Sequence, residues 1–345
     1  MFFYYDNFKN IYKSRFSAIT SLNPCYFYYY DKEFSKVDWT AEPSESLQNL
    51  YKKRAETLRE QNEYLILAYS GGIDSTNMLE TFYYNNIHID EILMIGAFSQ
   101  QSKFGTDDMN KDITINALPT LKKLNLKNTK INIIDYSTYF AEPKKLQIVS
   151  DYGTDWVYHI GGFMNMQNIV MKSIQNNIKN DSRKTAIIFG NDKPYIFLKN
   201  KKYYTQFKDL SFIDYGGYEL NGDFKRINFY TNFDSTDIIK KQLHTILNFQ
   251  KQLNRFDPKY LIIYNTKIIE ALIYPNIKNP LIHHSSKAKT NIFARRDSFM
   301  LDKTNTEIFK IYKDGILKLK KNSPNNIFQL NAFKTRDYEI GIEDD

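Results

Sequence analysis

The stretch YLILAYSGGIDSTNMLETF, Tyr64–Phe82, joins an apolar run to a glycine turn and then to a helical pattern. Residues 64–69 are continuously apolar, which is typical of a strand that is buried on both faces. From about residue 75 the apolar side chains follow helical spacing. A loop that leads from such a strand into a helix lies at the ligand-binding edge of a parallel sheet.

The residues of this loop predict a phosphate site. Gly71 and Gly72 allow backbone N–H groups to come close to an anion, and the helix dipole favours negative charge at that point. Further donors are the hydroxyl groups of Ser70, Ser75 and Thr76. The loop lacks the lysine of GxxxxGK[ST] and the spacing of GxGxxG, so it belongs to neither of those classes.

Asp74 is the most informative residue of the loop. A carboxylate beside phosphates repels them unless a divalent cation lies between, so Asp74 is expected to hold Mg²⁺ against a pyrophosphate. The alternative is that Asp74 is an N-cap on an ordinary glycine turn.

The same rhythm of apolar runs and helical patterns continues along the chain. It predicts an α/β fold, a Rossmann-like, doubly wound and mostly parallel sheet that is covered on both faces. Pro119 is expected to kink or divide its helix. The further expected strands are residues 91–98, 130–136 and 185–190, and the expected helices include 109–124 and 160–178.

The pattern divides the chain into three regions. Residues 1–60 are expected to form an irregular aromatic arm, up to residue 43, and a helix capped by Ser44. Residues 61–195 form the phosphate-binding domain. Residues 196–345 form a smaller C-terminal α+β region for a substrate or partner, with short strands at 201–207, 210–215 and 226–233, a helix at 235–253 and further helical segments.

Composition excludes several classes of protein. The 345 residues include a single cysteine, Cys25, which excludes an internal disulfide or a CxxC site, and the five histidines show no HxxxH spacing. No apolar stretch is long enough to span a membrane, so we expect a cytoplasmic protein without a membrane partner. The net charge of +8 agrees with a nucleic-acid partner, but abundant Lys, Asn, Ile, Tyr and Phe also arise in AT-biased coding sequences.

The SGGIDS motif, Ser70–Ser75, resembles the SGGxDS loop of the N-type ATP pyrophosphatases, also called the PP-loop or adenine nucleotide alpha hydrolase superfamily. Within that superfamily the chain is loosely most similar to the synthetase domain of asparagine synthetases. The resemblance implies a fold of the adenine nucleotide alpha hydrolase type that binds ATP and Mg²⁺ through residues 61–195. ATP is then cleaved between its α and β phosphates, an acceptor oxygen is adenylated, and a nucleophile displaces AMP.

The resemblance also assigns roles to individual residues. It implies that Ser70, Gly71, Gly72, Asp74 and Ser75 bind the pyrophosphate of ATP, with Thr76 extending the loop. The end of the second strand would border adenine, and the segment FGNDKPY, 189–195, would border the phosphates, with Asp192 holding a second Mg²⁺. Its GxDE form is missing here, and a solvated turn closed by Pro194 is the alternative. The expected cofactor-binding residues of these two segments are Ile95, Gly96, Ala97, Gly190 and Asp192; the expected catalytic residues are Asp74, Ser70 and Lys193.

The resemblance leaves three functions open. The first is an AMP-forming ligase or amidotransferase with small-molecule carboxylate and amine substrates. Because residue 2 is Phe and Cys25 has no glutaminase context, ammonia would come free or from a separate donor. The second is a tRNA- or nucleobase-modifying enzyme of the same superfamily, although the single cysteine argues against a sulfur relay. The third is a non-catalytic nucleotide-binding module.

Overall fold

In the computed structural model of the chain, the described residues are 2–13, 17–18, 21, 23–96, 112–135, 183–190, 193–209, 224–254, 266–277, 310, 313–314, 317 and 333–342. No helix within these ranges is long and apolar enough to cross a membrane.

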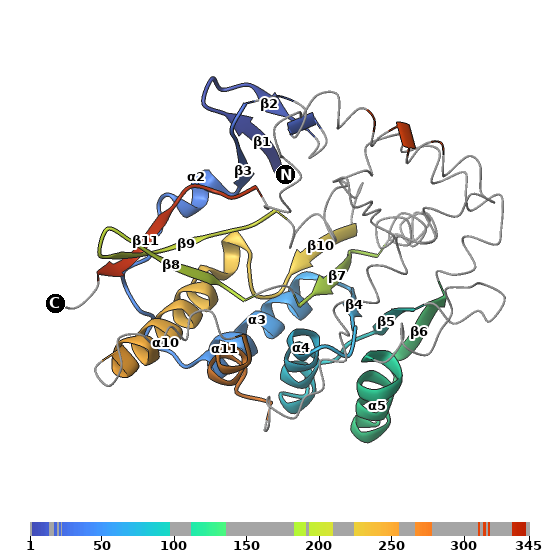
Figure 1. Cartoon of the computed structure of the whole chain (residues 1–345). Helices are drawn as coiled ribbons and strands as arrows, with labels where there is room; N and C mark the ends of the chain where they lie inside the picture. The colour runs from blue at the N-terminus through green and yellow to red at the C-terminus, as the bar shows by residue number, and fades with distance from the viewer. Residues whose placement is uncertain are drawn as a thin grey trace.

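A five-stranded parallel sheet forms the centre of the fold, in the order β10-β7-β4-β5-β6 (Figure 1). The chain enters at the middle strand, adds β5 and β6 on one side, and then adds β7 and β10 on the other. This confirms the predicted Rossmann-like α/β fold, and the switch point lies between β4 and β7. The strands are β4 (Tyr64–Ala68), β5 (Glu91–Gly96), β6 (Lys130–Asp135), β7 (Thr185–Phe189) and β10 (Phe224–Asn228).

Four of these strands match the four predicted apolar runs to within two residues. The fifth does not. The segment 226–233 is expected among the short strands of the C-terminal region, but β10 pairs with β7 in the central sheet. The physical reason is that β10 is mixed in polarity, with an exposed Lys225, and such a pattern does not show which sheet the strand joins, whereas all five residues of its neighbour β7 are buried. The division of the chain into three regions remains a prediction.

The described helices lie beside this sheet, and α3 contacts it at β4. Helix α3 packs against α4 and α10, and α10 packs against α11. Helices at each of these places are predicted; the helix at 160–178 lies outside the described residues. The helices that concern the site are α3 (Leu47–Gln61), α4 (Ile73–Tyr84), α10 (Thr236–Asn254) and α11 (Thr266–Ile273).

One helix start differs from the expectation and one predicted helix division is confirmed. The N-cap of α3 is Ser46 and not Ser44, because the Ser46 side chain accepts the Asn49 N–H at 3.3 Å. The predicted division at Pro119 is confirmed, since a π-helix at Asp112–Ala117 gives way there to α5 (Leu118–Leu124).

The N-terminal arm is not irregular, so that prediction is wrong. It is a three-stranded antiparallel sheet in the order β2-β1-β3, with β1 at Phe2–Asp6, β2 at Ile11–Tyr12 and β3 at Cys25–Tyr29, and it leads into the short helix α2 at Asp31–Phe34. Rings pair across its strands, for example Phe3 on Tyr28 at 4.3 Å. Aromatic residues on both faces hide the alternation that marks a strand in a sequence.

The C-terminal region contributes a third, antiparallel sheet in the order β11-β9-β8. The strand predicted at 201–207 is confirmed as β9, while β8 and β11 are not expected from the sequence. The strand predicted at 210–215 lies outside the described residues. The three strands are β8 (Tyr195–Lys199), β9 (Lys202–Gln206) and β11 (Tyr338–Ile342).

Asp6 makes the stability of the N-terminal sheet depend on pH. Burial by itself raises the pKa of Asp6, but hydrogen bonds from Asn10, Asn23 and Tyr12 outweigh it and lower the pKa from 3.8 to about 2. The contribution of these bonds is therefore complete above about pH 4 and disappears as the pH falls through about 2. We expect Asp6→Asn to lower the free energy of unfolding at pH 6 but not at pH 2, as measured by urea unfolding. An equal loss at both pH values would contradict this role.

Candidate functional site

The loop between β4 and α4 is a tight turn that its own hydroxyl groups hold in place. Gly71 has φ of 77°, a left-handed conformation that favours glycine. The Ser70 hydroxyl accepts the Gly72 N–H at 3.2 Å, and the hydroxyls of Ser75 and Thr76 donate to the Gly72 carbonyl at 3.0 and 2.9 Å. The predicted phosphate donors Ser70, Ser75 and Thr76 therefore all contact the loop backbone in this structure.

The loop presents the N-terminus of α4 to the carboxyl edge of the sheet. Gly72 is the N-cap residue and supplies no side-chain cap. The first backbone N–H groups of a helix have no acceptor within the helix, and they carry the positive end of its dipole. This end of α4 is thus chemically suited to an oxyanion such as a phosphate.

Gly190 brings the end of β7 against the same helix. A Cβ atom at Gly190 would lie 3.0 Å from both the C and O atoms of Asp74 and 3.1 Å from the N atom of Ser75. These are backbone atoms, so only glycine permits this approach. The predicted site residues Gly190, Asp74 and Ser75 thus meet at the switch point between β4 and β7.

We expect Gly190→Ala to strain this junction, because the added methyl group has to displace the backbone of α4. Overpacking of this kind costs about 1–3 kcal/mol of unfolding free energy. Gly341→Ala is the matched control, since its Cβ would meet only the Leu247 side chain, at 3.3 Å. Urea unfolding of both variants tests the prediction, and equal stabilities would show that the close approach at Gly190 is not a constraint.

The Asp74 carboxylate binds two groups from distant parts of the chain. The Lys193 Nζ lies 2.8 Å from Oδ1 and 3.0 Å from Oδ2, and the Tyr274 hydroxyl donates to Oδ1 at 2.6 Å. The Asp74 and Lys193 side chains are 23% and 17% exposed, so the pair is partly shielded but still reached by solvent. Two residues that the sequence predicts separately as catalytic, Asp74 and Lys193, are therefore in direct contact.

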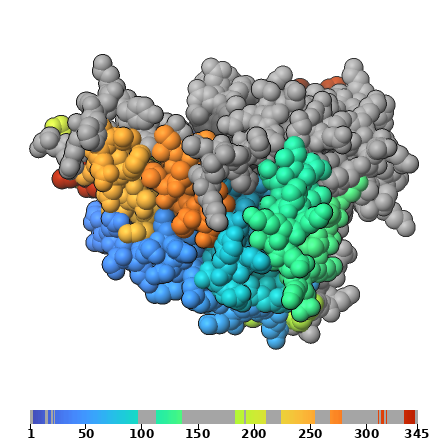
Figure 2. Space-filling model, turned by 90° about the horizontal axis from the view of Figure 1, so that it is seen from below, coloured from blue at the N-terminus to red at the C-terminus, as the bar shows by residue number. Residues whose placement is uncertain are grey.

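A second carboxylate holds the other side of Lys193. The Glu270 Oε1 lies 3.1 Å from the Lys193 Nζ, and the Glu270 Oε2 lies 3.1 Å from the Lys267 Nζ. Glu270 is nearly buried, with 6% of its side chain exposed. It comes from α11, which lies between α10 and α4 on the face in Figure 2. The Lys193 ammonium thus occupies a position between two carboxylates.

Buried tyrosines connect Asp74 to the core. The Tyr230 hydroxyl donates to the Asp74 carbonyl at 2.8 Å and accepts from the Asn77 Nδ2 at 3.0 Å. The Tyr230 and Tyr274 rings pack with centroids 5.5 Å apart. Burial raises the pKa of Tyr274 well above 10, and the charge of Asp74 raises it further. Burial likewise raises the pKa of Tyr230, so both hydroxyls stay protonated and act as donors at neutral pH.

Tyr230, Glu270 and Tyr274 are not among the residues predicted from the sequence. Tyr230 follows β10 by two residues, so correct placement of that strand in the central sheet would have put it at the same edge as Gly190. Glu270 and Tyr274 are four residues apart in EALIY, one helical turn, but the apolar surroundings indicate only a core helix.

The other predicted site residues are Ile95, Gly96, Ala97 and Asp192. Ile95 and Gly96 end β5, the neighbour of β4, at the same edge of the sheet. Within the described part of the chain, no hydrogen bond or ion pair joins them to the loop. Ala97 and Asp192 lie outside the described residues, so their expected contacts with adenine and with a second metal ion remain predictions.

The donor set fits a divalent cation next to a phosphate. Across the described ranges no group of three or more His, Cys, Asp or Glu side chains could hold a metal alone. Asp74, however, offers carboxylate oxygens, the ligand type that Mg²⁺ prefers, beside a helix N-terminus suited to phosphate. The Lys193 ammonium already occupies a cation position at 2.8 Å from this carboxylate. A metal ion at Asp74 would thus take its other ligands from phosphate and water.

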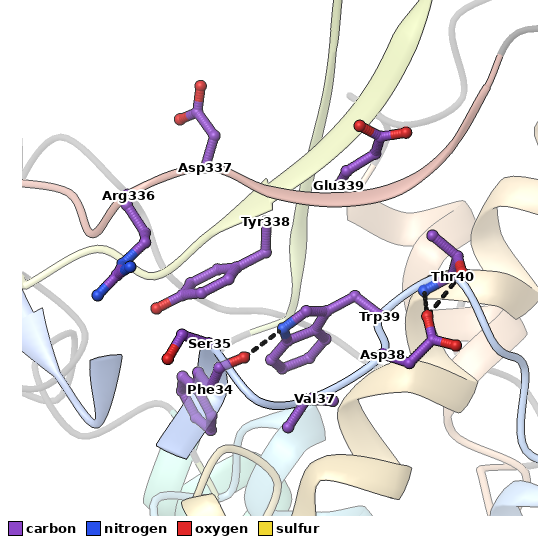
Figure 3. A pocket seen from close by; sticks show the side chains of 10 residues that line it. All are labelled: Phe34, Ser35, Val37, Asp38, Trp39, Thr40, Arg336, Asp337, Tyr338 and Glu339. Carbon is purple, nitrogen blue, oxygen red and sulfur yellow. Dashed lines mark hydrogen bonds between the residues drawn. The ribbon is translucent and has the colours of Figure 1, made fainter. Parts of the chain in front are cut away.

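A separate groove of about 330 Å³ lies between residues 34–40 and β11 (Figure 3). Its acidic side chains already have partners. Asp337 accepts from the Lys199 Nζ at 3.0 Å, and Glu339 accepts from the Lys202 Nζ at 2.8 Å. The Trp39 indole N–H donates to the Phe34 carbonyl at 2.9 Å. The Trp39 and Tyr338 rings pack with centroids 5.4 Å apart, so the groove is a junction between the β8-β9-β11 sheet and the N-terminal segment.

Comparison with known proteins identifies no family. No protein-family model matches the chain, and no curated protein matches it. Among solved structures, the NH3-dependent NAD synthetase from Campylobacter jejuni in complex with the nitrate ion is similar to it, with 16% sequence identity and a TM-score of 0.31. The match covers 81% of this chain and 96% of that one. A likeness of this degree does not establish membership of a family.

Proposed function

We propose that the chain is an ATP-using, AMP-forming ligase of the PP-loop type that transfers an amine. In its more specific form it adenylates a carboxylate or carbonyl oxygen and then accepts ammonia or another amine, as in the synthetase domain of asparagine synthetases without a glutaminase domain. The observation that carries this proposal is the contact between Asp74 and Lys193 at the N-terminus of α4, with Nζ 2.8 Å from Oδ1. A carboxylate and an ammonium group at one phosphate-binding edge suit the binding of a metal-bound polyphosphate.

The residues have distinct roles in this reaction. The N–H groups at the start of α4 and the turn at Gly71 bind the β and γ phosphates. Lys193 neutralises the charge that develops on the departing pyrophosphate. Asp74 would hold Mg²⁺, which supplies further charge neutralisation when bound. Tyr274 and Tyr230 orient Asp74 through its carboxylate and its carbonyl group.

The proposed reaction has two chemical steps, adenylation of the acceptor and transfer of the amine. An acceptor carboxylate oxygen attacks the α phosphorus, the bond from that phosphorus to the α,β-bridging oxygen breaks, and pyrophosphate leaves. An amine then attacks the activated carbonyl carbon, loses a proton, and displaces AMP, which keeps the acceptor oxygen. Binding holds the reactants in line and replaces two encounters in solution with reactions at one site.

The test is the position at which ATP is cleaved. With labelled ATP, Mg²⁺, ammonium and a panel of ¹⁸O-labelled carboxylates, the products should be AMP and pyrophosphate, with ¹⁸O in AMP. Without an acceptor, turnover should be slow because no oxygen is positioned at the α phosphorus. ADP and orthophosphate as products, formed equally well by Ser70→Ala, would contradict the mechanism.

A nucleic-acid acceptor is the second candidate, favoured by the net charge of +8. In that case transfer RNA, rather than a small carboxylate, should stimulate AMP formation. Its binding should also weaken steeply with salt, with the logarithm of affinity linear in the logarithm of salt concentration. Gel shifts at low and high salt distinguish this function from the small-molecule ligase.

A further inference from the structure

Lys193 occupies the position in which a metal ion would bind Asp74, and Asp74 occupies the position in which a phosphate would bind Lys193. The ammonium of Lys193 lies 2.8 and 3.0 Å from the two carboxylate oxygens of Asp74. We infer that this ion pair makes the site selective for a complex of a divalent cation with a polyphosphate, and that it rejects either component alone. This inference rests on the proposed function and specifies what its site admits.

A free divalent cation cannot bind the Asp74 carboxylate without competing with Lys193, which is already paired with it. To bind Asp74 it has to approach the Lys193 ammonium, a like charge, or displace it. Displacement separates Lys193 from Asp74, although the Glu270 Oε1 still lies 3.1 Å from the Lys193 Nζ. Because both side chains of the Asp74–Lys193 pair are less than a quarter exposed, water compensates only part of this loss. The affinity of the site for the cation alone is therefore low.

A free polyphosphate is repelled by the carboxylates that surround Lys193. An anion that approaches Lys193 also approaches the carboxylates of Asp74 and Glu270, which lie on either side of the ammonium. Asp74 stands in the first turn of α4, so its charge opposes the anion at the same place where the helix dipole attracts it. Phosphate without a metal is therefore bound weakly.

A metal–polyphosphate complex removes both obstacles at once. Its cation replaces the ammonium as the partner of Asp74, and its phosphate oxygens replace the Asp74 carboxylate as the partner of Lys193. After the exchange Asp74 faces the cation and Lys193 faces the phosphate oxygens, so neither partner of the pair loses an opposite charge. Binding of the cation and of the polyphosphate is thus positively coupled, and the coupling is reciprocal.

Glu270 is the positioning residue of this exchange. It is 6% exposed and is held by Lys267 at 3.1 Å, so it remains in place when Lys193 leaves Asp74. Lys193 therefore stays at the phosphate site and does not turn to solvent. The Tyr274 hydroxyl, at 2.6 Å from Asp74 Oδ1, keeps the carboxylate oriented during the exchange.

Calorimetry on the full chain tests the inference with three probes: Mg²⁺ alone, pyrophosphate with a chelator, and Mg²⁺ with pyrophosphate. In the wild type each component should raise the affinity for the other by about 10- to 100-fold, within the usual range of coupling between sites. Equal affinity for pyrophosphate with and without Mg²⁺ would overturn the inference.

Two variants should each weaken the selectivity for the complex, one in favour of free Mg²⁺ and the other in favour of metal-free pyrophosphate. Lys193→Met leaves the Asp74 and Glu270 carboxylates facing each other, so the affinity for free Mg²⁺ should rise about tenfold while pyrophosphate binding weakens. Asp74→Asn should instead raise the affinity for metal-free pyrophosphate. The matched control is Lys241→Met. It breaks an ion pair in which the Lys241 Nζ lies 2.7 Å from the Glu42 Oε1, and it should change neither affinity because this pair does not involve the loop.

The outcomes separate this inference from the proposed function. If the folded wild type binds neither Mg·ATP nor Mg·pyrophosphate, both are wrong. If it binds Mg·ATP but binds free Mg²⁺ or free pyrophosphate equally well, only the inference fails. If Lys193→Met lowers the affinity for free Mg²⁺, the ion pair does not compete with the metal and the inference is likewise overturned.

Discussion

Asp74→Asn is expected to lower the affinity of the chain for Mg·ATP about a hundredfold. The substitution removes the negative charge that would hold the metal ion while it keeps the size and shape of the side chain. Binding of AMP, which has no pyrophosphate, should change much less. Calorimetry with Mg·ATP and with AMP measures the two effects separately.

The fold should survive this change. The amide oxygen of Asn can still accept the Tyr274 hydroxyl, which donates to Oδ1 at 2.6 Å in the wild type, and the backbone carbonyl at position 74 still accepts from Tyr230. Asp237→Asn is a suitable control, because Asp237 also lies in the first turn of a helix but is 64% exposed. Unchanged Mg·ATP affinity in a folded Asp74→Asn chain would exclude a metal-bridging role for Asp74.

The central strands could be predicted because burial on both faces leaves a local mark in the sequence. Residues 64–68 and 186–189 are continuously apolar, and both belong to the interior of the sheet. The edge strand at 224–228 carries Lys225 and Arg226, so its sequence resembles that of a strand in a small antiparallel sheet. Only its pairing with residues 185–189 shows where it belongs, and pairing over such a distance is not visible in local pattern.

The candidate site likewise has one part that the sequence predicts and another part that it does not. The glycine turn, the carboxylate and the helix start are contiguous in sequence, so the chemistry of residues 70–76 is visible at once. Tyr274 meets Asp74 across 200 positions and Tyr230 meets it across 156, and each looks like an ordinary core aromatic in its own segment. Local patterns predict which residue types a loop offers, but they do not predict which distant side chains orient them.

Asp234→Asn is expected to cause a large loss of stability, because Asp234 compensates a buried charge. The Arg54 side chain, on α3, is only 3% exposed, and its Nη1 lies 2.9 Å from the Asp234 Oδ2. Its Nη2 donates to the Asn228 carbonyl at 3.4 Å, at the end of β10. The pair therefore connects α3 to the segment that carries Tyr230 to the candidate site.

The two partners of this pair should respond unequally. Removing the carboxylate leaves a buried guanidinium without a counter-charge, and breaking a buried pair in this way costs about 3–5 kcal/mol. Because Asp234 itself is 37% exposed, solvent screens part of the interaction, and we expect a loss of about 2–3 kcal/mol in the free energy of unfolding. Arg54→Met removes the buried charge together with its desolvation cost and leaves an Asp234 that water can solvate, so it should cost less. The double variant should resemble Arg54→Met more closely than Asp234→Asn in urea unfolding. A neutral Asp234→Asn combined with a severely destabilised Arg54→Met would mean that packing of the arginine stem, and not its charge, joins α3 to the end of β10.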